Sequence, residues 1–234
     1  MMLMTTEIQR IVFSESMKIA DLIDVNFKLL NVLSRLDISL GFGENTIMEV
    51  CERQGIDLKS FLLICNVYTY DGYIPSVEQM SGADPATIVD YLHNSHSFYL
   101  LKEFTALEEE LKAMVEPCDA TQKKVVARFF SDYKAQVENH FEYEESVVFP
   151  YIRALMAGQR YASYSIEQFE ENHSNIDETL NDLKNIVMKY LPDTCDTVLR
   201  NQVLYRIYRL GEDLLKHTLI EDNILIPMVN KIEE

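Results

Sequence analysis

The sequence predicts an all-α protein whose main part is an up-down-up-down four-helix bundle, and its composition gives two reasons. Glycine and proline are scarce, with 7 and 6 residues in a chain of 234, whereas a sheet-rich fold would use them in its many turns. Leu, Glu, Lys, Met and Ala dominate instead, and these residues favour helices. Hydrophobic residues make up 47% of the chain, which allows a sizeable core and argues against disorder.

The chain is acidic, with a formal net charge of −17 and an isoelectric point of about 4.7. An acidic surface repels phosphate backbones and anionic lipids, so neither nucleic acid nor a membrane is expected as a partner. The start shows no basic segment followed by an apolar stretch, and no apolar run approaches the roughly 20 residues that span a bilayer. We therefore expect a cytoplasmic location. Four dispersed cysteines without a C-x-x-C motif are expected there as free thiols. They are Cys51, Cys65, Cys118 and Cys195.

The first part of the chain, residues 1–72, is predicted to form a small helical domain. An apolar helical pattern covers residues 8–36. After a turn with two glycines, Thr46 and Glu49 have the spacing of a capping box at the start of a short helix. Gly55 is placed to end that helix.

The two short helices around Gly55 could also be taken for a DNA-binding helix-turn-helix, with Asp57 capping the second helix. Residues 1–72 carry six Lys and Arg against ten Asp and Glu. The basic surface that DNA binding requires is therefore missing, and a simple packing hairpin is favoured.

Residues 73–84 are predicted to be a linker, and the bundle is predicted to occupy residues 85–234. Asp84 followed by Pro85 is typical of a helix N-cap with proline in the first position. Four long helical patterns follow, joined by short connections, as in an up-down-up-down bundle. They cover residues 85–115, 120–157, 165–191 and 195–232.

Two stretches of the bundle share the pattern H-x-x-x-E-acid-x-x-x-apolar-P, one beginning at His140 and the other at His217. They are 77 residues apart, and the same offset relates His96 to His173. Surface ion pairs or isolated core histidines do not explain so many residue types repeating at one offset. The bundle is therefore interpreted as a doubled helical hairpin with two equivalent half-sites. The six candidate metal ligands are His96, His140, Glu144, His173, His217 and Glu221.

The spacing within each stretch suits metal binding. Residues i and i+4 lie on one face of a helix, so His140 with Glu144, and His217 with Glu221, point together into the bundle. Each metal can take two imidazoles, and the two carboxylates can bridge the metals. With a solvent-derived oxo or hydroxo bridge, each metal keeps an open position for a small molecule. Such ligation suits two iron ions, or manganese, better than a closed structural zinc site.

Several residues beside the candidate ligands are given lesser roles. His93 has no histidine at the 77-residue offset, so it is expected at the surface, beside the ligands or as a substitute ligand. Glu145 and Asp222 follow the ligand glutamates and, about 100° further round the helix, are expected at helix seams or in solvent. Pro150 and Pro227 lie within predicted helices, where their matched position suggests a deliberate kink.

The bundle resembles the hemerythrin-like family and, within it, the di-iron proteins known as repair of iron centres. The resemblance covers residues from about 85 to 234, and the two H-x-x-x-E motifs are its most specific mark. The repair-type proteins use four histidines and two glutamates, which is the number found here. The N-terminal stretch LGFGENTIMEVCERQGIDLKSFLLICN also resembles the small helical domain of that family. Where the family has a cysteine pair, this chain has Gly41-Phe42-Gly43, and Cys51 is expected to be an unreactive helix residue.

The resemblance implies protection or repair of iron–sulfur clusters after damage by nitric oxide or oxidants. Damaged iron–sulfur proteins would then be partners, and nitric oxide or dioxygen would react at the metals. Two alternatives stay open. One is a protein that reversibly binds or senses dioxygen or nitric oxide, and the other is an enzyme that reduces nitric oxide or peroxide.

Overall fold

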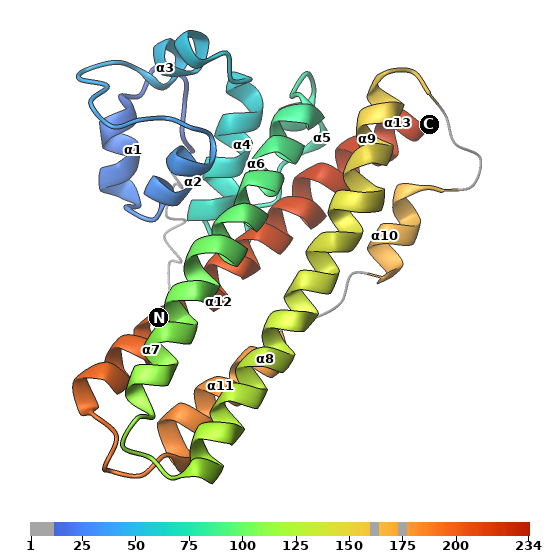
Figure 1. Ribbon diagram of the computed structural model, residues 1–234. Coiled ribbons are helices and arrows are strands. Elements are labelled where there is room, and N and C mark those ends of the chain that lie inside the picture. Colours follow the sequence, from blue (N-terminus) through green and yellow to red (C-terminus); the bar gives the residue numbers. More distant parts are fainter. Residues whose placement is uncertain (1–11, 160–163, 173–176) are drawn as a thin grey trace, which may run out of the picture. The chain divides into compact units, whose positions relative to one another are not determined.

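The computed structural model describes residues 12–159, 164–172 and 177–234, and the regular structure of these ranges is helical (Figure 1). An isolated antiparallel bridge joins Lys18 to Thr46. The all-α fold class predicted from composition is confirmed. The chain divides into two compact units, Met1–Asp84 and Pro85–Glu234.

The described part of the first unit, from residue 12 onward, contains five short helices. They are α1 (Ile19–Val25), α2 (Leu29–Arg35), α3 (Ile47–Gln54), α4 (Leu58–Thr69) and α5 (Val77–Met80). The pattern expected to form one helix over residues 8–36 is broken, which corrects that prediction, and its part before residue 12 lies outside the described residues. At the break Asn26 is extended, and its side chain accepts a hydrogen bond from the Lys28 N–H at 3.1 Å. An asparagine that bonds nearby backbone in this way competes with helix continuation.

The helix ends predicted in the first unit are confirmed. Thr46 and Glu49 form a reciprocal capping box at the start of α3. Gly55 ends that helix with a φ of 69°, in the left-handed region that glycine tolerates. The Asp57 side chain accepts a hydrogen bond from the Ser60 N–H at 2.8 Å and so caps α4.

Residues 73–84, expected as a linker, belong to the first unit by their contacts. They include α5, and two side chains of α4 bond to them. Lys59 Nζ donates to the carbonyl of Ser81 at 2.7 Å, and Ser60 Oγ donates to the carbonyl of Asp84 at 3.0 Å.

Within its described residues, the second unit forms four long helical stretches, and each of them includes one widened, π-helical turn. The first stretch is α6 (Pro85–Phe98), η1 (Tyr99–Glu103) and α7 (Phe104–Met114), and the second is α8 (Ala120–Tyr143), η2 (Glu144–Val148) and α9 (Phe149–Met156). The third stretch is α10 (Ile166–Asn172), α11 (Asp177–Asn185) and η3 (Ile186–Tyr190). The fourth stretch is α12 (Thr197–Ile220), η4 (Glu221–Leu225) and α13 (Ile226–Glu233). Asp119 and Asp196 cap α8 and α12. The first stretch packs on the second and the fourth, and the third packs on the same two. This is the predicted bundle.

The two matched prolines explain two of the widened turns. Pro150 is the second residue of α9 and follows η2, and Pro227 is the second residue of α13 and follows η4. Proline has no N–H to donate, and its ring clashes with the carbonyl four residues earlier in a regular helix. A widened turn relieves that clash. In both stretches the turn begins at a candidate ligand, Glu144 or Glu221.

Arg206 ties α12 to the first helical stretch. Its guanidinium donates to both carboxylate oxygens of Glu110, at 2.7 and 2.9 Å, and to Glu103 at 3.0 Å. Because a bidentate, partly buried pair is stronger than an exposed one, Arg206→Ala is expected to lower the free energy of unfolding by about 1–2 kcal/mol. Urea unfolding would measure the loss. Arg209→Ala, an exposed arginine one turn along α12, is the control and should change little; equal effects would contradict the prediction.

Candidate metal centre

Four of the predicted ligands meet in the core of the bundle. His96 comes from α6, Glu144 opens η2, His217 lies near the end of α12, and Glu221 opens η4. All four are buried, and one donor atom from each lies within 4.8 Å of the donor atoms of the others. Three helical stretches thus deliver two imidazoles and two carboxylates to one point.

His140 joins this cluster through Glu144. Its Nε2 lies 2.9 Å from one carboxylate oxygen of Glu144, and His96 Nε2 lies 3.0 Å from the other. The other i, i+4 pair has a similar geometry, with His217 Nε2 at 3.0 Å from Glu221 Oε1. Glu144 therefore stands between a histidine of its own helix and one from α6.

The donor atoms are arranged for a cation rather than for each other. Both oxygens of Glu144 are fully buried, and neither accepts a hydrogen bond of good geometry. The Nε2 atoms of His96 and His217 face each other at 3.2 Å. Two imidazole nitrogens at that distance need a shared proton or a cation, and a buried carboxylate is costly without a positive partner. The residues therefore fit a metal ion held by mixed nitrogen and oxygen ligands.

Aromatic rings close the site against water. Phe141 stacks on His96 with ring centroids 3.9 Å apart, and Phe149 stacks at 5.5 Å. Phe141 and Tyr99 are buried and pack together at 5.9 Å. These rings fix the plane of the His96 imidazole, so its donor atom is oriented before any ligand binds.

Glu145 contacts two histidines, a role that sequence reasoning missed. One of its carboxylate oxygens lies 2.7 Å from Nδ1 of His96, and the carboxylate also lies 2.8–2.9 Å from Nδ1 of His93. Glu145 lies at the seam between η2 and α6, which is one of the two positions expected for it, but its contact with the candidate ligand His96 was not foreseen. His93 is half exposed and adjoins the site through Glu145.

These carboxylates change the proton affinity of His96. Burial, the largest influence, lowers the pKa of His96, but the close carboxylates of Glu144 and Glu145 outweigh it and raise the pKa to about 9. Burial would raise the pKa of Glu145, but its contacts with His96 and His93 keep it below its usual range. Without a metal, a proton therefore supplies the positive charge of the cluster near neutral pH.

The raised pKa predicts that metal-free protein loses stability as the pH rises above neutral. The folded-state pKa of His96 is about 9, against an ordinary value of 6.5. The stabilisation is thus complete below about pH 6.5 and is lost as the pH passes through about 9, by an amount on the order of 3 kcal/mol. Urea unfolding of metal-free protein at pH 6 and at pH 9.5 measures it. His96→Gln should flatten the profile; an unchanged profile would refute the assignment.

The sixth predicted ligand, His173, lies outside the described residues, so its position stays a prediction. Among the described residues, the cluster consists of His96, His140, Glu144, His217 and Glu221. The 77-residue offset is the sequence signal that selected all of these.

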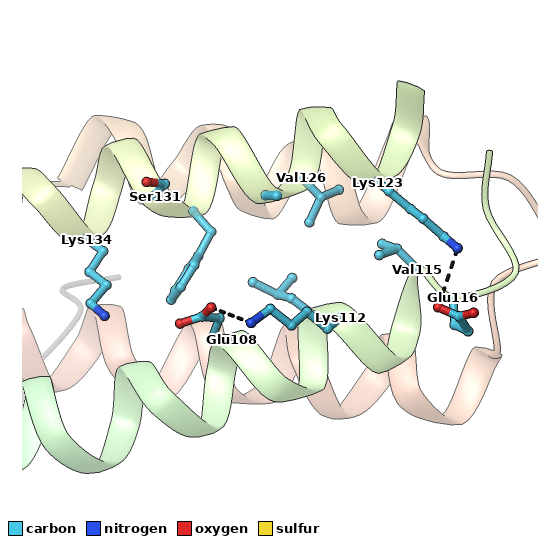
Figure 2. Close-up of a pocket in the computed structure, with 11 residues that line it drawn as sticks. Glu108, Lys112, Val115, Glu116, Lys123, Val126, Ser131 and Lys134 are labelled. Carbon is cyan, nitrogen blue, oxygen red and sulfur yellow. Dashed lines mark hydrogen bonds and ion pairs between the residues drawn. The ribbon is translucent and has the colours of Figure 1, made fainter. Parts of the chain in front are cut away.

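A cavity lies elsewhere in the bundle, between α7 and α8 (Figure 2). Its volume is about 600 Å³, and Leu111, Val126 and Phe130 form part of an apolar floor. The lysines at its rim are paired with glutamates, including Lys112 with Glu108. None of the candidate ligands that the structure describes lines it. With its rim charges already paired, this cavity offers no reactive group, and the His–Glu cluster remains the candidate site.

Four helical stretches around a buried imidazole–carboxylate cluster define a class, the metal-binding helical bundles. Comparison with known families agrees: the Hemerythrin HHE cation binding domain matches residues 87–229. The chain belongs to the hemerythrin family, which confirms the resemblance seen in the sequence.

Two curated relatives are similar over most of their length. A probable iron-sulfur cluster repair protein from Haemophilus influenzae is 28% identical over 154 residues, which cover 64% of this chain and 67% of the relative. The iron-sulfur cluster repair protein YtfE from Cronobacter sakazakii is 26% identical over 199 residues, covering 82% of this chain and 85% of the relative. In the part of the chain that the structure describes, no helix is long and apolar enough to cross a membrane.

Proposed function

We propose that the chain binds two iron ions in the core of its bundle and acts in the repair of damaged iron–sulfur clusters. The observation that carries the proposal is the cluster of His96, His140, Glu144, His217 and Glu221, whose imidazole nitrogens and carboxylate oxygens converge in the core of the bundle. The names of the two relatives, both iron–sulfur cluster repair proteins, support the same role.

In this proposal the ligands are those predicted from the sequence, including His173. Glu144 and Glu221 each open a widened turn, and in this proposal their carboxylates would be shared by the two metals. When bound, the iron pair would supply redox chemistry with nitric oxide or dioxygen, and it would also be a source of iron for donation to a damaged cluster. The residues of the chain hold the ligands rigid, and Phe141 and Phe149 exclude water from His96.

Metal content is the first test. Protein expressed with iron and purified without chelators is expected to carry about two iron ions per chain. Purified protein that carries no iron would refute the proposal. Zinc at about one ion per chain would point to a structural site instead.

Repair is the second test. Iron-loaded protein is mixed with an iron–sulfur enzyme whose cluster has been damaged by nitric oxide, and recovery of that enzyme's activity is followed. Recovery that depends on the loaded protein supports the proposal. Iron-loaded protein that neither restores activity nor transfers iron would refute the repair role while leaving the metal centre intact.

A second candidate function rests on the N-terminal unit. The turn that carries a cysteine pair in the repair family has Gly41 and Gly43 here, both with positive φ values of 96° and 58°. Loss of those thiols favours reversible binding or sensing of dioxygen or nitric oxide. A stable absorption band that appears with the gas and disappears on its removal would distinguish this function, whereas irreversible oxidation in air would exclude it for dioxygen.

A further inference from the structure

Glu145 occupies a special position beside the candidate metal centre. Its side chain is 35% exposed, yet its carboxylate reaches inward to His96, whose side chain is only 4% exposed. The Oε1–Nδ1 distance is 2.7 Å. The same carboxylate contacts Nδ1 of His93, which is 51% exposed, at 2.8 Å. Glu145 thus links a buried candidate ligand to a histidine at the surface.

The chemistry of this contact fixes the tautomer of His96. An ionised carboxylate can only accept hydrogen bonds, so Nδ1 of His96 must carry the hydrogen. The other ring nitrogen, Nε2, faces the cluster, 3.0 Å from Glu144 and 3.2 Å from Nε2 of His217. With Nδ1 protonated, Nε2 is the atom left to bind a cation.

We propose that Glu145 is a positioning residue of the metal centre: it accepts the Nδ1–H of His96 and so fixes Nε2 as the ligating atom. This inference rests on the proposed metal site. A carboxylate behind a ligating histidine fixes the ring orientation and raises its basicity, and removing such a partner typically weakens metal binding 10- to 100-fold. Among the described residues, Glu145 supplies the acceptor that contacts Nδ1 of His96.

His93 completes the arrangement by holding Glu145 in place. A glutamate that is partly exposed loses side-chain entropy when it is fixed in one rotamer. The Nδ1 atom of His93 lies within 2.9 Å of both carboxylate oxygens, which restricts Glu145 from the solvent side. His93 therefore acts on the metal site through Glu145, and not as a substitute ligand.

The central test uses Glu145→Gln in the full, iron-loaded chain. The amide keeps the size of the side chain but removes the charge, so iron is expected to pass to a ferrous chelator about 10-fold faster. The reduction potential of the centre should rise, because His96 becomes a weaker electron donor. Glu142→Gln removes a charge from an exposed position on the same helix and is the matched control.

The outcomes separate this inference from the proposed function. If wild-type protein binds no iron, the proposed function fails. If wild-type protein binds iron and Glu145→Gln matches Glu142→Gln in both chelation rate and potential, only the role of Glu145 fails. Glu145→Asp keeps the charge on a shorter side chain and should restore part of the wild-type potential; no recovery would point to shape rather than charge.

A double-mutant cycle tests His93. His93→Phe is expected to speed iron loss a few-fold in the wild-type background, since Glu145 becomes less restricted. In the Glu145→Gln background the same change should add little, because the two residues act in series. Fully additive effects would contradict the arrangement and would mean that His93 acts by another route.

A separate observation concerns two cysteines outside this site. Cys118 and Cys195 are 77 residues apart, and each directly precedes an aspartate that caps a long helix, Asp119 or Asp196. They are therefore matched positions of the doubled hairpin. Both are buried in the same core cluster. Burial, together with the neighbouring Cys195, raises the pKa of Cys118 to about 11.

From this pairing of matched positions we infer that Cys118 and Cys195 form a disulfide under oxidative stress. With hydrogen peroxide as the oxidant, the two thiols lose two protons and two electrons, one S–S bond forms, and the peroxide is reduced to two molecules of water. Little thiolate is present near neutral pH, so the reaction is slow. Once formed, the bond joins the α7–α8 connection to the α11–α12 connection and restricts the unfolded chain.

Metal-free protein incubated with peroxide tests this inference. Peptide mapping should find Cys118 linked to Cys195, and the melting temperature should rise by on the order of 10 °C and fall back after reduction. Cys118→Ser should lose the rise, while Cys51→Ser, in the first unit, should keep it. Thiols that remain free, or a bridge through Cys51 or Cys65, would overturn the inference.

Discussion

Replacing Glu144 by alanine is expected to remove iron from both halves of the centre, not from one. The carboxylate lies between His140 and His96, at 2.9 and 3.0 Å, on two different helical stretches. If the two metals share it, its loss takes one ligand from each. We therefore expect iron content to fall from about two ions per chain to well below one. Metal analysis after purification in excess iron gives the number.

The control for this prediction must separate ligand loss from loss of charge. Glu142→Ala removes a carboxylate two positions away, at an exposed site of α8, and should leave iron content unchanged. Far-ultraviolet circular dichroism should show both variants fully helical. If Glu144→Ala keeps one iron per chain, Glu144 serves a single metal, and the bridging arrangement is wrong.

The bundle could be predicted from the sequence because its signals are local and repeated. In the first unit, helix ends likewise depended on single residues such as Asp57, whose side chain accepts a hydrogen bond from the Ser60 N–H. The candidate ligands were identified because they repeat at an offset of 77 residues, and the pattern of a single helix does not contain this signal. The prediction of four long stretches is matched by helices that end within a residue or two of the expected positions.

The roles that could not be predicted depend on departures from regular helix geometry. In a regular α-helix Glu145 would point about 100° away from Glu144, which is why it was assigned to a seam or to solvent. Both residues lie in η2, where each turn holds more residues and successive side chains diverge less. Glu144 and Glu145 can therefore both reach His96. The sequence shows Pro150, but it does not show that a widened turn accommodates this proline.

Truncating Phe141 is expected to cause a large loss of stability. The ring is 1% exposed, stacks on His96 at 3.9 Å and lies 5.6 Å from His217. Phe141→Ala removes this packing and leaves a cavity, so the free energy of unfolding should fall by about 3–5 kcal/mol. Phe141→Leu fills most of that volume and should lose about 1–2 kcal/mol. Urea unfolding of metal-free protein measures both.

Phe130→Ala separates the two roles of Phe141. Phe130 is a buried phenylalanine of the same helix that packs on Phe104 at 6.3 Å, about three turns from the cluster. Both truncations should destabilise metal-free protein by similar amounts. Only Phe141→Ala should also weaken iron binding, because His96 loses the ring that fixes its plane, and the iron-loaded form should then lose more stability than the metal-free form. Equal losses in the two forms would mean that Phe141 supports the fold without orienting the ligand.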